Sequence, residues 1–532
     1  MRTIIIGNII LLLFFLLTGC TEGITSDESE TTASFENEDF KHFKTELDIQ
    51  VEAREDSILS KIYTQNHSFW MDEDLILNQQ GLAAIDHISH AQHFGLNPEL
   101  YNAQYFDSLP DQLSPEMAAS IELELTLSFY KFVKHLRYGI IPSEYYKKIT
   151  ALKIKNDSID LLDIFQQSDI VIAGLNLQPQ HHYYKDLQTA VANFYANNEL
   201  TEETIYIPNF KKDSAAAYEK AREVLVKLKY LKAEDKGEKV VEAVKEFQKS
   251  NGLTPDGLIG KYTVQMLELS TRKMYFQAAA NLEKWRWIDS WGDTYFFANI
   301  PEFVINIYHQ DSLIIKNKTV VGTVTNRTPE VESKIDYFIV NPEWYVPMSI
   351  TANELIPKQK KDSTYLQRNG YVLSSGASVD NVNWSTASAG NVKIKQKSGG
   401  FNALGKVKFI FSNSHSVYFH DTPSKSFFNK DIRSYSHGCV RVQDPFEIAN
   451  FLLENEANPD WPTTLDTLLK YKTTKTFTVK KEYPVHIGYF TSTTDSSGRL
   501  RTLIDIYQKD TLLNNLFEQY YFGESSAQIK LL

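Results

Sequence analysis

The spacing of hydrophobic residues changes along the chain, and the changes divide it into regions. From about residue 43 to residue 205, apolar positions recur with the period of a helix, as in the stretch from Ile121 to Phe129. The segment 93–98 is typical of a helix end, because Gly95 can take the left-handed cap and Pro98 prevents continuation. The pattern predicts an all-helical domain over residues 43–205, which we interpret as a scaffold without chemistry of its own.

A second helical unit is predicted over residues 214–269, with apolar faces on helices near 221–231 and 240–250. The second helix stops at Asn251-Gly252, and a Pro-Asp-Gly turn and a third helix opened by Thr263 follow. Phe247-Gln248, Gly252-Leu253, Asp256-Gly257 and Gly260 with Thr263 together resemble the small three-helix peptidoglycan-binding domain. The alternative is a generic helical hairpin with a Pro-Asp-Gly turn, and a glycan ligand is implied by the resemblance alone.

Beyond a helix predicted over about 263–285, the apolar period changes to two. Alternating runs predict strands joined by short turns near 303–308, 312–315, 319–322 and 337–340. Residues 406–420 predict a hairpin, with Val407, Phe409 and Phe411 on one face and Tyr418 and His420 on the opposite face.

Further elements would complete this β domain: a helix near 446–453 and strands near 476–491 and 500–507. We expect the tryptophans of this half, Trp285, Trp287 and Trp344, to lie in the core. The predicted fold class is multidomain α+β, with the mainly-β domain over residues 280–532.

One stretch of the β domain, residues 355–400, is polar and rich in glycine and serine, and it holds a single tryptophan, Trp384. A long segment with so little apolar periodicity is often a functional lid. We interpret it as a lid, and a disordered excursion is the alternative.

The N-terminus carries an apolar run from Ile4 to Leu17, which as a helix would span roughly 21 Å. This is short of the roughly 30 Å of a bilayer core, so a signal peptide fits better than a membrane span. Leu17-Thr18-Gly19-Cys20 resembles a bacterial lipobox, which implies a signal peptide over residues 1–20 and lipidation of Cys20; an ordinary signal sequence is the alternative. Residues 21–42 are predicted to be a flexible tether, and no later stretch is apolar enough to span a membrane.

Composition narrows the class of protein. The net charge is −12, with 42% hydrophobic and 13% aromatic residues, which is typical of a folded protein. A chain of this length requires more than one hydrophobic core. The acidic balance and the absence of a basic stripe argue against nucleic acid as a partner.

The chain has only two cysteines. If Cys20 is lipidated, Cys439 has no disulfide partner, and a lone thiol in an exported protein is a liability unless it has a function. A thiol with a nearby imidazole is the composition of a cysteine nucleophile with its base. An adjacent imidazolium would lower the thiol pKa and give a reactive ion pair.

Two histidines could serve this thiol. In an extended segment, His437 and Cys439 would face the same way, roughly 6.5–7 Å apart. His420 ends a strand that could lie beside the cysteine segment, at the roughly 4.8 Å spacing of neighbouring strands, so we favour His420 as the base.

The neighbours of the thiol add to this hypothesis. Gly438 allows a turn that aims amide N–H groups at one point, where they could stabilise an oxyanion. Arg441 follows on the same face and could bind a carboxylate or a carbonyl of the substrate. Taken singly, a buried cysteine, a core histidine and a surface arginine would be the simpler interpretation; together they favour a catalytic site.

These residues form a recognisable motif. His420-Asp421-Thr422-Pro423, the run Ser436-His437-Gly438-Cys439-Val440-Arg441, and Asp444-Pro445 resemble the signature of the L,D-transpeptidases. Asn402-Ala403-Leu404-Gly405 and Asn341-Pro342-Glu343-Trp344 strengthen the resemblance. The order of scaffold, peptidoglycan-binding module and catalytic domain is similar to that of a large member of this family, which lacks the lipobox found here.

The resemblance implies that Cys439 attacks the carbonyl between the third and fourth residues of a tetrapeptide stem. His420 would accept the thiol proton, the carbonyl of Asp421 would orient its ring, and the amides of Gly438 and Cys439 would hold the oxyanion. An amine of an acceptor stem would resolve the thioester to a 3→3 crosslink. The remaining site residues would bind substrate or orient the reacting groups: Tyr418, Ser436, His437, Arg441 and, closing over the site, Trp384.

The resemblance also implies a role in peptidoglycan biosynthesis, cell-wall biogenesis and cell shape, with acylation of Cys439 by carbapenems and with neither metal nor cofactor. The expected location is the periplasm, with the lipid at Cys20 in a membrane; Thr21 favours the outer membrane. Two other functions stay open. The same nucleophile could serve an L,D-carboxypeptidase or a peptidase that releases wall proteins, and the chain could be a non-catalytic wall-binding lipoprotein.

Overall fold

The computed structural model describes residues 37–64, 68–156, 159–288, 290–456, 458–462, 465–469 and 473–523. The predicted signal peptide, the lipidation site Cys20 and most of the tether lie outside these residues. No helix in the described part of the chain is long and apolar enough to cross a membrane.

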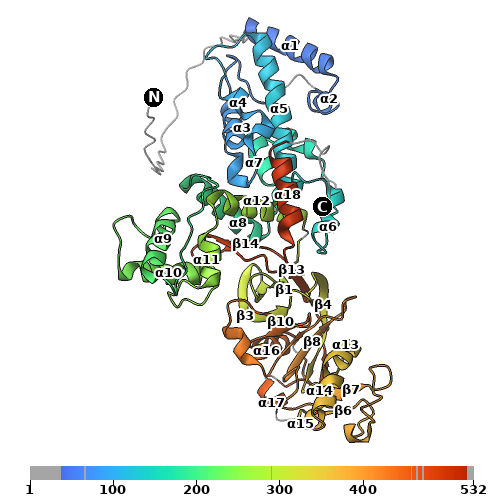
Figure 1. Cartoon of the computed structure of the whole chain (residues 1–532). Helices are drawn as coiled ribbons and strands as arrows, with labels where there is room; N and C mark the ends of the chain where they lie inside the picture. Colours follow the sequence, from blue (N-terminus) through green and yellow to red (C-terminus); the bar gives the residue numbers. More distant parts are fainter. Residues whose placement is uncertain are drawn as a thin grey trace, which may run out of the picture.

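The N-terminal region is helical, as predicted (Figure 1). Its longest helix is α5, which begins behind Ser114, whose side chain accepts a hydrogen bond from the N–H of Met117. The helices of this region are α1 (Glu38–Arg54), α2 (Leu59–Ile62), α3 (Gln79–Ser89), α4 (Ala103–Phe106), α5 (Pro115–Tyr138), α6 (Tyr146–Ile149), α7 (Ile170–Leu175) and α8 (His182–Asn197). Gly95 caps a short 3₁₀ turn with φ +68°, so the predicted helix end at 93–98 is confirmed.

Two later helices complete this scaffold core, α12 (Thr271–Trp287) and α18 (Asp510–Tyr521). The ring of Tyr521 lies 4.9 Å from that of Phe276, and its carbonyl accepts a hydrogen bond from Asn97. Figure 1 shows α18, in red, against the helical region rather than within the β domain. The predicted domain of residues 280–532 missed this, because the apolar face of α18 finds its partners on helices far away in sequence.

The second helical unit consists of α9 (Ser214–Lys227), α10 (Glu238–Ser250) and α11 (Lys261–Leu267). Gln248 pins its turn: the amide donates to Asp256, to Thr263 and to the carbonyl of Leu258, and it accepts from the N–H of Gly257. The helix predicted over 263–285 is in fact two, α11 and α12, because Ser270 caps a new helix start.

The β domain is built on one large sheet of order β10-β3-β11-β9-β8-β4-β13-β1-β2, with β12 also paired to β4. Its strands are β1 (Thr294–Asn299), β2 (Val304–His309), β3 (Ser312–Gly322), β4 (Val331–Val340), β8 (Val407–Phe411), β9 (Phe419–His420), β10 (Ser434–Ser436), β11 (Val440–Val442), β12 (Lys475–Thr478) and β13 (Pro484–Gly488). The long strand β3 pairs with β2 through its first half and with β11 through its second, so the strands close into a ring around an apolar interior. Helix α16 (Pro445–Glu456) packs its apolar side into the same interior.

Two predictions for this domain need correction. The strand predicted near 476–491 is in fact two, β12 and β13, whereas the strand predicted near 500–507 is β15 (Leu500–Thr502), which pairs with β14 (Ser492–Thr494) and not with the large sheet. Trp285 and Trp287 are buried as predicted, whereas Trp344 is only half-buried.

The candidate lid, residues 355–400, is folded as one unit with residues 344–354 before it, and this whole unit is called the lid below. The strands β5 (Trp344–Tyr345), β7 (Ile394–Gln396) and β6 (Tyr371–Leu373) form a small sheet of their own. It packs with α13 (Met348–Ile350), the short π-helix η5 (Thr351–Leu355), α14 (Ile356–Lys361) and α15 (Tyr365–Arg368) around a separate apolar cluster. Trp384 belongs to that cluster and donates to the carbonyl of Val379, so the disordered alternative is excluded.

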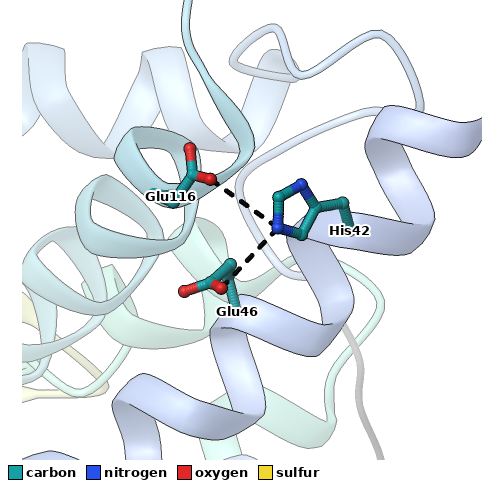
Figure 2. A group of neighbouring side chains, drawn as sticks. All are labelled: His42, Glu46 and Glu116. Atoms are coloured by element: carbon teal, nitrogen blue, oxygen red, sulfur yellow. Dashed lines mark ion pairs between the residues drawn. The ribbon is translucent and has the colours of Figure 1, made fainter.

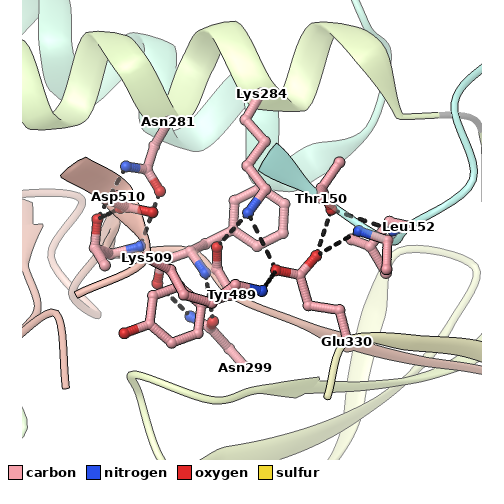
Figure 3. A network of polar contacts seen from close by, with 12 residues as sticks. Thr150, Leu152, Asn281, Lys284, Asn299, Glu330, Tyr489, Lys509 and Asp510 are labelled. Carbon is pink, nitrogen blue, oxygen red and sulfur yellow. Dashed lines mark hydrogen bonds and ion pairs between the residues drawn. The ribbon is translucent and has the colours of Figure 1, made fainter. Parts of the chain in front are cut away.

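A buried polar network joins the scaffold to the β domain (Figure 3). At its centre Glu330, just before β4, lies 3.8 Å from Lys284 of α12 and 2.6 Å from Lys509. Thr150 and the N–H of Ala151, both in the scaffold, also donate to this carboxylate. Burial alone would raise the pKa of the Glu330 carboxyl, yet Lys284 and Lys509 hold that pKa below its ordinary value. The network therefore fixes the start of β4 to α12 and to the scaffold segment that holds Thr150 and Ala151.

Candidate active site

Three neighbouring strands place the candidate residues in one row. Lys408 on β8 is the register partner of His420 on β9, and His420 is that of Arg441 on β11. Register partners on adjacent strands point to the same face. Cys439 and Tyr418 precede Arg441 and His420 by two residues each, and the N–H of Val440 bonds the carbonyl of Tyr418. The predicted pairing of the His420 strand with the cysteine segment is therefore confirmed.

His420 is buried and held in one orientation. Its Nδ1 lies 2.5 Å from the carbonyl oxygen of Asp421, the contact that the resemblance implies. A carbonyl oxygen can only accept, so Nδ1 carries the proton and Nε2 is left as an acceptor in the neutral ring. Burial, together with the positive charges of Arg441 and Lys408, lowers the pKa of His420 to about 3, although the Asp421 carbonyl acts in the opposite direction.

The thiol of Cys439 is half-buried, with Sγ 4.0 Å from the carbonyl oxygen of Ser416. Burial raises the pKa of the Cys439 thiol, and hydrogen bonds from Tyr418 and the charges of Lys408 and Arg441 offset this only in part. The expected thiolate–imidazolium pair is therefore wrong for the resting protein. Burial penalises both charged forms, so the thiol and the imidazole rest neutral.

Tyr418 is the immediate neighbour of the sulfur. The two side chains share a hydrogen bond, and burial together with the sulfur raises the pKa of the Tyr418 hydroxyl. The side chain of Trp344 also hydrogen-bonds this hydroxyl. Among the described residues no hydrogen bond joins His420 to Cys439, and the ring of Tyr418 lies 5.5 Å from that of His420.

Lys408 is a site residue that the sequence analysis missed. Its Nζ lies 3.8 Å from the centre of the Tyr418 ring, a cation–π contact. Burial lowers the pKa of the Lys408 ammonium, while the sulfur of Cys439 acts to raise it. The alternation that places Val407 and Phe409 in the apolar core requires Lys408 to face His420, and this signal could have identified it.

The loop before Cys439 departs from two expectations. Ser436 is buried: its hydroxyl donates to the carbonyl of Cys439 at 2.5 Å and accepts from the N–H of Gly438 at 3.1 Å, so it braces the loop rather than lining the substrate site. The Gly438 N–H is thereby occupied, and of the two predicted oxyanion donors only the Cys439 N–H lacks a partner within the described residues.

Gly438 has φ +117°, a conformation open to glycine and costly for other residues. Its carbonyl accepts a hydrogen bond of 2.7 Å from Thr328. This turn breaks the extended geometry expected for residues 437–439. His437 is exposed and pairs through Nε2 with Glu354 of the lid at 2.6 Å, away from the thiol.

Arg441 follows its predicted place on the cysteine face. Its Nε is buried and has no hydrogen-bond partner in the described part of the chain, and its guanidinium carbon lies 6.0 Å from the centre of the Phe427 ring. An unsatisfied guanidinium beside a nucleophile is suited to a substrate carboxylate or carbonyl. For Trp384, by contrast, the structure shows contacts within the lid cluster only.

Asp421 is anchored on its other side. Its carboxylate accepts from the N–H of Lys406 at 2.8 Å and from Nζ of Lys425 at 2.7 Å. Gly405 has φ +60°, and a Cβ there would lie 2.2 Å from the Asp421 carboxylate. The Asn-Ala-Leu-Gly segment therefore leaves room for the residue that orients His420.

A second group of ionisable side chains lies at the far end of the scaffold. Nε2 of His42 on α1 lies 3.6 Å from Glu46 and 3.6 Å from Glu116 of α5 (Figure 2). Half or more of the His42 and Glu116 side chains is exposed, so this cluster links two helices at the surface and adds nothing to the cysteine site.

Comparisons with known proteins agree with this geometry. Residues 293–487 match the family described as "L,D-transpeptidase catalytic domain", residues 57–191 a "Scaffold domain", and residues 214–267 a "Putative peptidoglycan binding domain". A "Putative L,D-transpeptidase" of Haemophilus influenzae is 32% identical over 223 residues, which cover 41% of this chain and 45% of the relative. The match thus spans less than half the length of that relative.

Among solved structures, the "Ldtfm-avibactam carbamoyl enzyme" aligns with 37% of this chain and 49% of its own, at 12% identity and a TM-score of 0.20, an overlap too small to carry an argument. The family matches, together with the pairing of β9 with β11 beside Cys439, do support an assignment of the domains. Residues 293–487 have the sequence pattern and the fold of the L,D-transpeptidase catalytic-domain family, and they follow regions that match a scaffold domain and a peptidoglycan-binding domain.

Proposed function

We propose that the chain is an L,D-transpeptidase that works through a thioester on Cys439. Sγ attacks the carbonyl between the third and fourth residues of a tetrapeptide stem, Nε2 of His420 takes the thiol proton, and the same proton leaves on the amine of the departing D-alanine. An acceptor amine then attacks the thioester, returns a proton through His420 to the sulfur, and forms the 3→3 crosslink. Every bond formed is balanced by one broken, without a cofactor.

The single observation behind this proposal is the row of side chains on one face of the sheet. A nucleophile, a neutral base held by a carbonyl, and two cations meet within two strand positions. The tetrahedral intermediate carries a negative oxygen, which the free N–H of Cys439 and the positive charge of Lys408 and Arg441 would stabilise. A general base with an unprotonated Nε2 at neutral pH is the form that such a mechanism needs.

Incubation of the purified protein with disaccharide-tetrapeptides tests the reaction. Formation of crosslinked dimer with release of D-alanine supports transpeptidation. Release of D-alanine without dimer identifies the alternative, an L,D-carboxypeptidase in which water resolves the thioester. The absence of both products would sink the enzymatic proposal.

The nucleophile has its own test. Exposure to a carbapenem should add one inhibitor mass to the wild type and none to Cys439→Ala, as read by intact mass spectrometry. A protein that binds isolated cell walls yet stays unmodified would instead be a non-catalytic wall-binding lipoprotein, the remaining alternative.

The position of the protein in the cell is a further part of the proposal. We expect lipidation at Cys20 to hold the domains in the periplasm, at the outer membrane. Labelling with a radioactive fatty acid should mark the wild type and leave Cys20→Ala unmarked, and fractionation of the two membranes would identify the leaflet.

A further inference from the structure

A large cleft separates the peptidoglycan-binding-type domain from the β domain. It has a volume of about 720 Å³ and is lined on one side by the end of α10 and the loop after it, and on the other by β3 and the segment 428–433. Hydrogen bonds join the two walls, because the N–H and the hydroxyl of Thr254 both donate to Asp431 at 2.7 Å.

The cleft is cationic in a protein whose net charge is −12. Four exposed lysines line it, and none has a carboxylate partner among the described residues: Lys249, Lys316, Lys318 and Lys430. Of its two carboxylates, Glu302 is paired with Arg501 and Asp431 accepts from Thr254. Uncompensated cations in a concave site concentrate anions from solution.

Two arginines are built into the floor of the cleft. Arg433 is buried, and its guanidinium is held by the carbonyls of Thr319, Lys430 and Phe303. Arg501 is 8% exposed and donates from Nη1 to Glu302 at 2.8 Å, while its Nε is buried without a hydrogen-bond partner in the described part of the chain. A buried, incompletely satisfied guanidinium beside a cavity is a donor ready for a ligand.

The sequence leaves room for Arg501. Gly252 ends α10 with φ +73°, and a Cβ at this position would lie 2.3 Å from Nη2 of Arg501. The glycine that stops the helix therefore also lets the guanidinium approach the loop of the neighbouring domain. This close approach makes the cleft a shared feature of the two domains.

The cleft lies between two other sites. Thr254 and Asp431 also line a second cavity, of about 630 Å³, on the peptidoglycan-binding-type domain itself. The cleft is also lined by Gln443, which follows β11 directly and lies four residues after Cys439. Four residues span at most about 14 Å, which is also the reach of an extended tetrapeptide.

We propose that this cleft binds the carboxylates of peptidoglycan stem peptides, and so leads stems from the binding domain to the catalytic strand. The proposal rests on the proposed function for its choice of ligand. The lysines supply long-range attraction, and Arg501, whose Nε has no hydrogen-bond partner in the described part of the chain, supplies a fixed donor for a carboxylate. The glycan chain itself would stay in the neighbouring cavity.

The experiment compares two double variants in a Cys439→Ala background, where no turnover complicates binding. Lys316→Glu/Lys318→Glu reverses two charges in the cleft, and Lys147→Glu/Lys185→Glu reverses two exposed charges on the scaffold. The probe is a soluble tetrapeptide stem, measured by calorimetry beside the same stem with its carboxyl groups amidated.

The cleft variant should bind the free-acid stem on the order of tenfold more weakly than the control variant does. Amidation should weaken binding to the control variant and make no difference to the cleft variant. Equal affinities in the two variants, or undiminished binding of the amidated stem, would overturn the proposal, as would a cleft that binds phosphate in preference to the stem.

Failure of the proposed function would look different. Carbapenem acylation of the same double variants, with Cys439 restored, should proceed at the wild-type rate, because the lysines lie outside the cysteine row. If the protein bound stems through the lysines and yet no carbapenem acylated Cys439, the proposal for the cleft would stand and the proposed transpeptidase function would fail.

Discussion

The carbonyl oxygen of Asp421 lies 2.5 Å from Nδ1 of His420, and this contact decides which ring nitrogen carries the proton. The carboxylate of the same Asp421 is anchored by Lys406 and Lys425, so the carbonyl cannot drift without breaking contacts on the far side. The base is thus oriented from the protein interior and needs no partner on the thiol side to keep its tautomer. This explains how a neutral imidazole can wait beside a neutral thiol.

His420→Ala should slow carbapenem acylation of Cys439 by about 10²–10⁴-fold, the usual effect of losing a general base. His437→Ala should slow it by less than about tenfold, because His437 pairs with Glu354 rather than with the thiol. Rates from stopped-flow fluorescence or timed mass spectrometry would rank the two. The reverse order would show that His437 is the base.

Acylation should hardly depend on pH between about pH 5 and pH 8. The pKa of His420 is about 3, so the ring stays an acceptor throughout this range, and burial keeps the Cys439 thiol protonated. Thiolate absorbance, as the difference between wild type and Cys439→Ala, should appear only above the ordinary thiol range. An acylation rate that rises steeply around the ordinary histidine pKa of 6.5 would instead show that the thiolate and the imidazolium form an ion pair.

The low pKa of His420 should also make the free energy of unfolding depend on pH. The unfolded ring binds a proton at its ordinary pKa of 6.5, whereas the folded ring resists protonation down to about 3. Acid therefore favours the unfolded chain, and the free energy of unfolding should fall as the pH drops below the ordinary histidine range. His420→Phe should remove this part of the pH dependence, as measured by denaturant unfolding at several pH values.

The alternation of the predicted hairpin located His420 and Tyr418, because a strand with a buried face has only one register that hides Val407 and Phe409. The same alternation implied Lys408, but a lone lysine on a strand carries no motif. The turn at Gly438 redirected His437, and a positive φ cannot be predicted from an extended pattern. The burial of His420 and Cys439 could not be predicted from the local sequence. Because burial lowers the pKa of the imidazole and raises that of the thiol, both groups are neutral and the expected ion pair does not form.

Domain boundaries show a second limit. Period and turn signals located three helices over residues 214–269, since each is fixed by local residues such as Gln248 and the Pro-Asp-Gly turn. The docking of α18 on α12 depends on contacts such as Phe276 with Tyr521, which no local pattern encodes. A helix at the end of a chain can pack on any exposed apolar face, and only the folded structure selects one.

Thr328→Val should slow acylation about tenfold and lower the free energy of unfolding by about 1–3 kcal/mol. The buried hydroxyl donates to the carbonyl of Gly438 at 2.7 Å and accepts from the N–H of Gly322 at 2.8 Å, so valine keeps the shape and loses both bonds. Thr328→Ser keeps the hydroxyl and should recover most of the rate. If valine and serine behaved alike, the hydrogen bond to the cysteine loop would be irrelevant.

Glu354→Gln should loosen the lid while leaving the fold intact. The pair between Glu354 and His437 is exposed, so its loss should cost less than about 1 kcal/mol. Hydrogen exchange across β5, β6 and β7 should nevertheless become faster, because this pair ties the lid to the cysteine loop. Lys358→Gln is the matched control, since Lys358 contacts the same carboxylate within the lid; equal exchange in both variants would exclude a tether.

Glu330→Gln should lower the free energy of unfolding by about 3–5 kcal/mol, because it leaves Lys284 charged and buried without its carboxylate. The pKa of the Glu330 carboxyl is depressed, so its contribution to stability is present above the ordinary carboxyl range and lost as the pH falls through the pKa of the folded state.

Glu482→Gln is the control. The Glu482 side chain, which pairs with Lys334, is 75% exposed, so this ion pair should contribute about 1 kcal/mol at most. Denaturant unfolding of both variants would compare them, and because Glu330 lies two residues from Thr328, carbapenem acylation should slow only in Glu330→Gln. Equal stabilities would mean that water reaches the network and screens its charges.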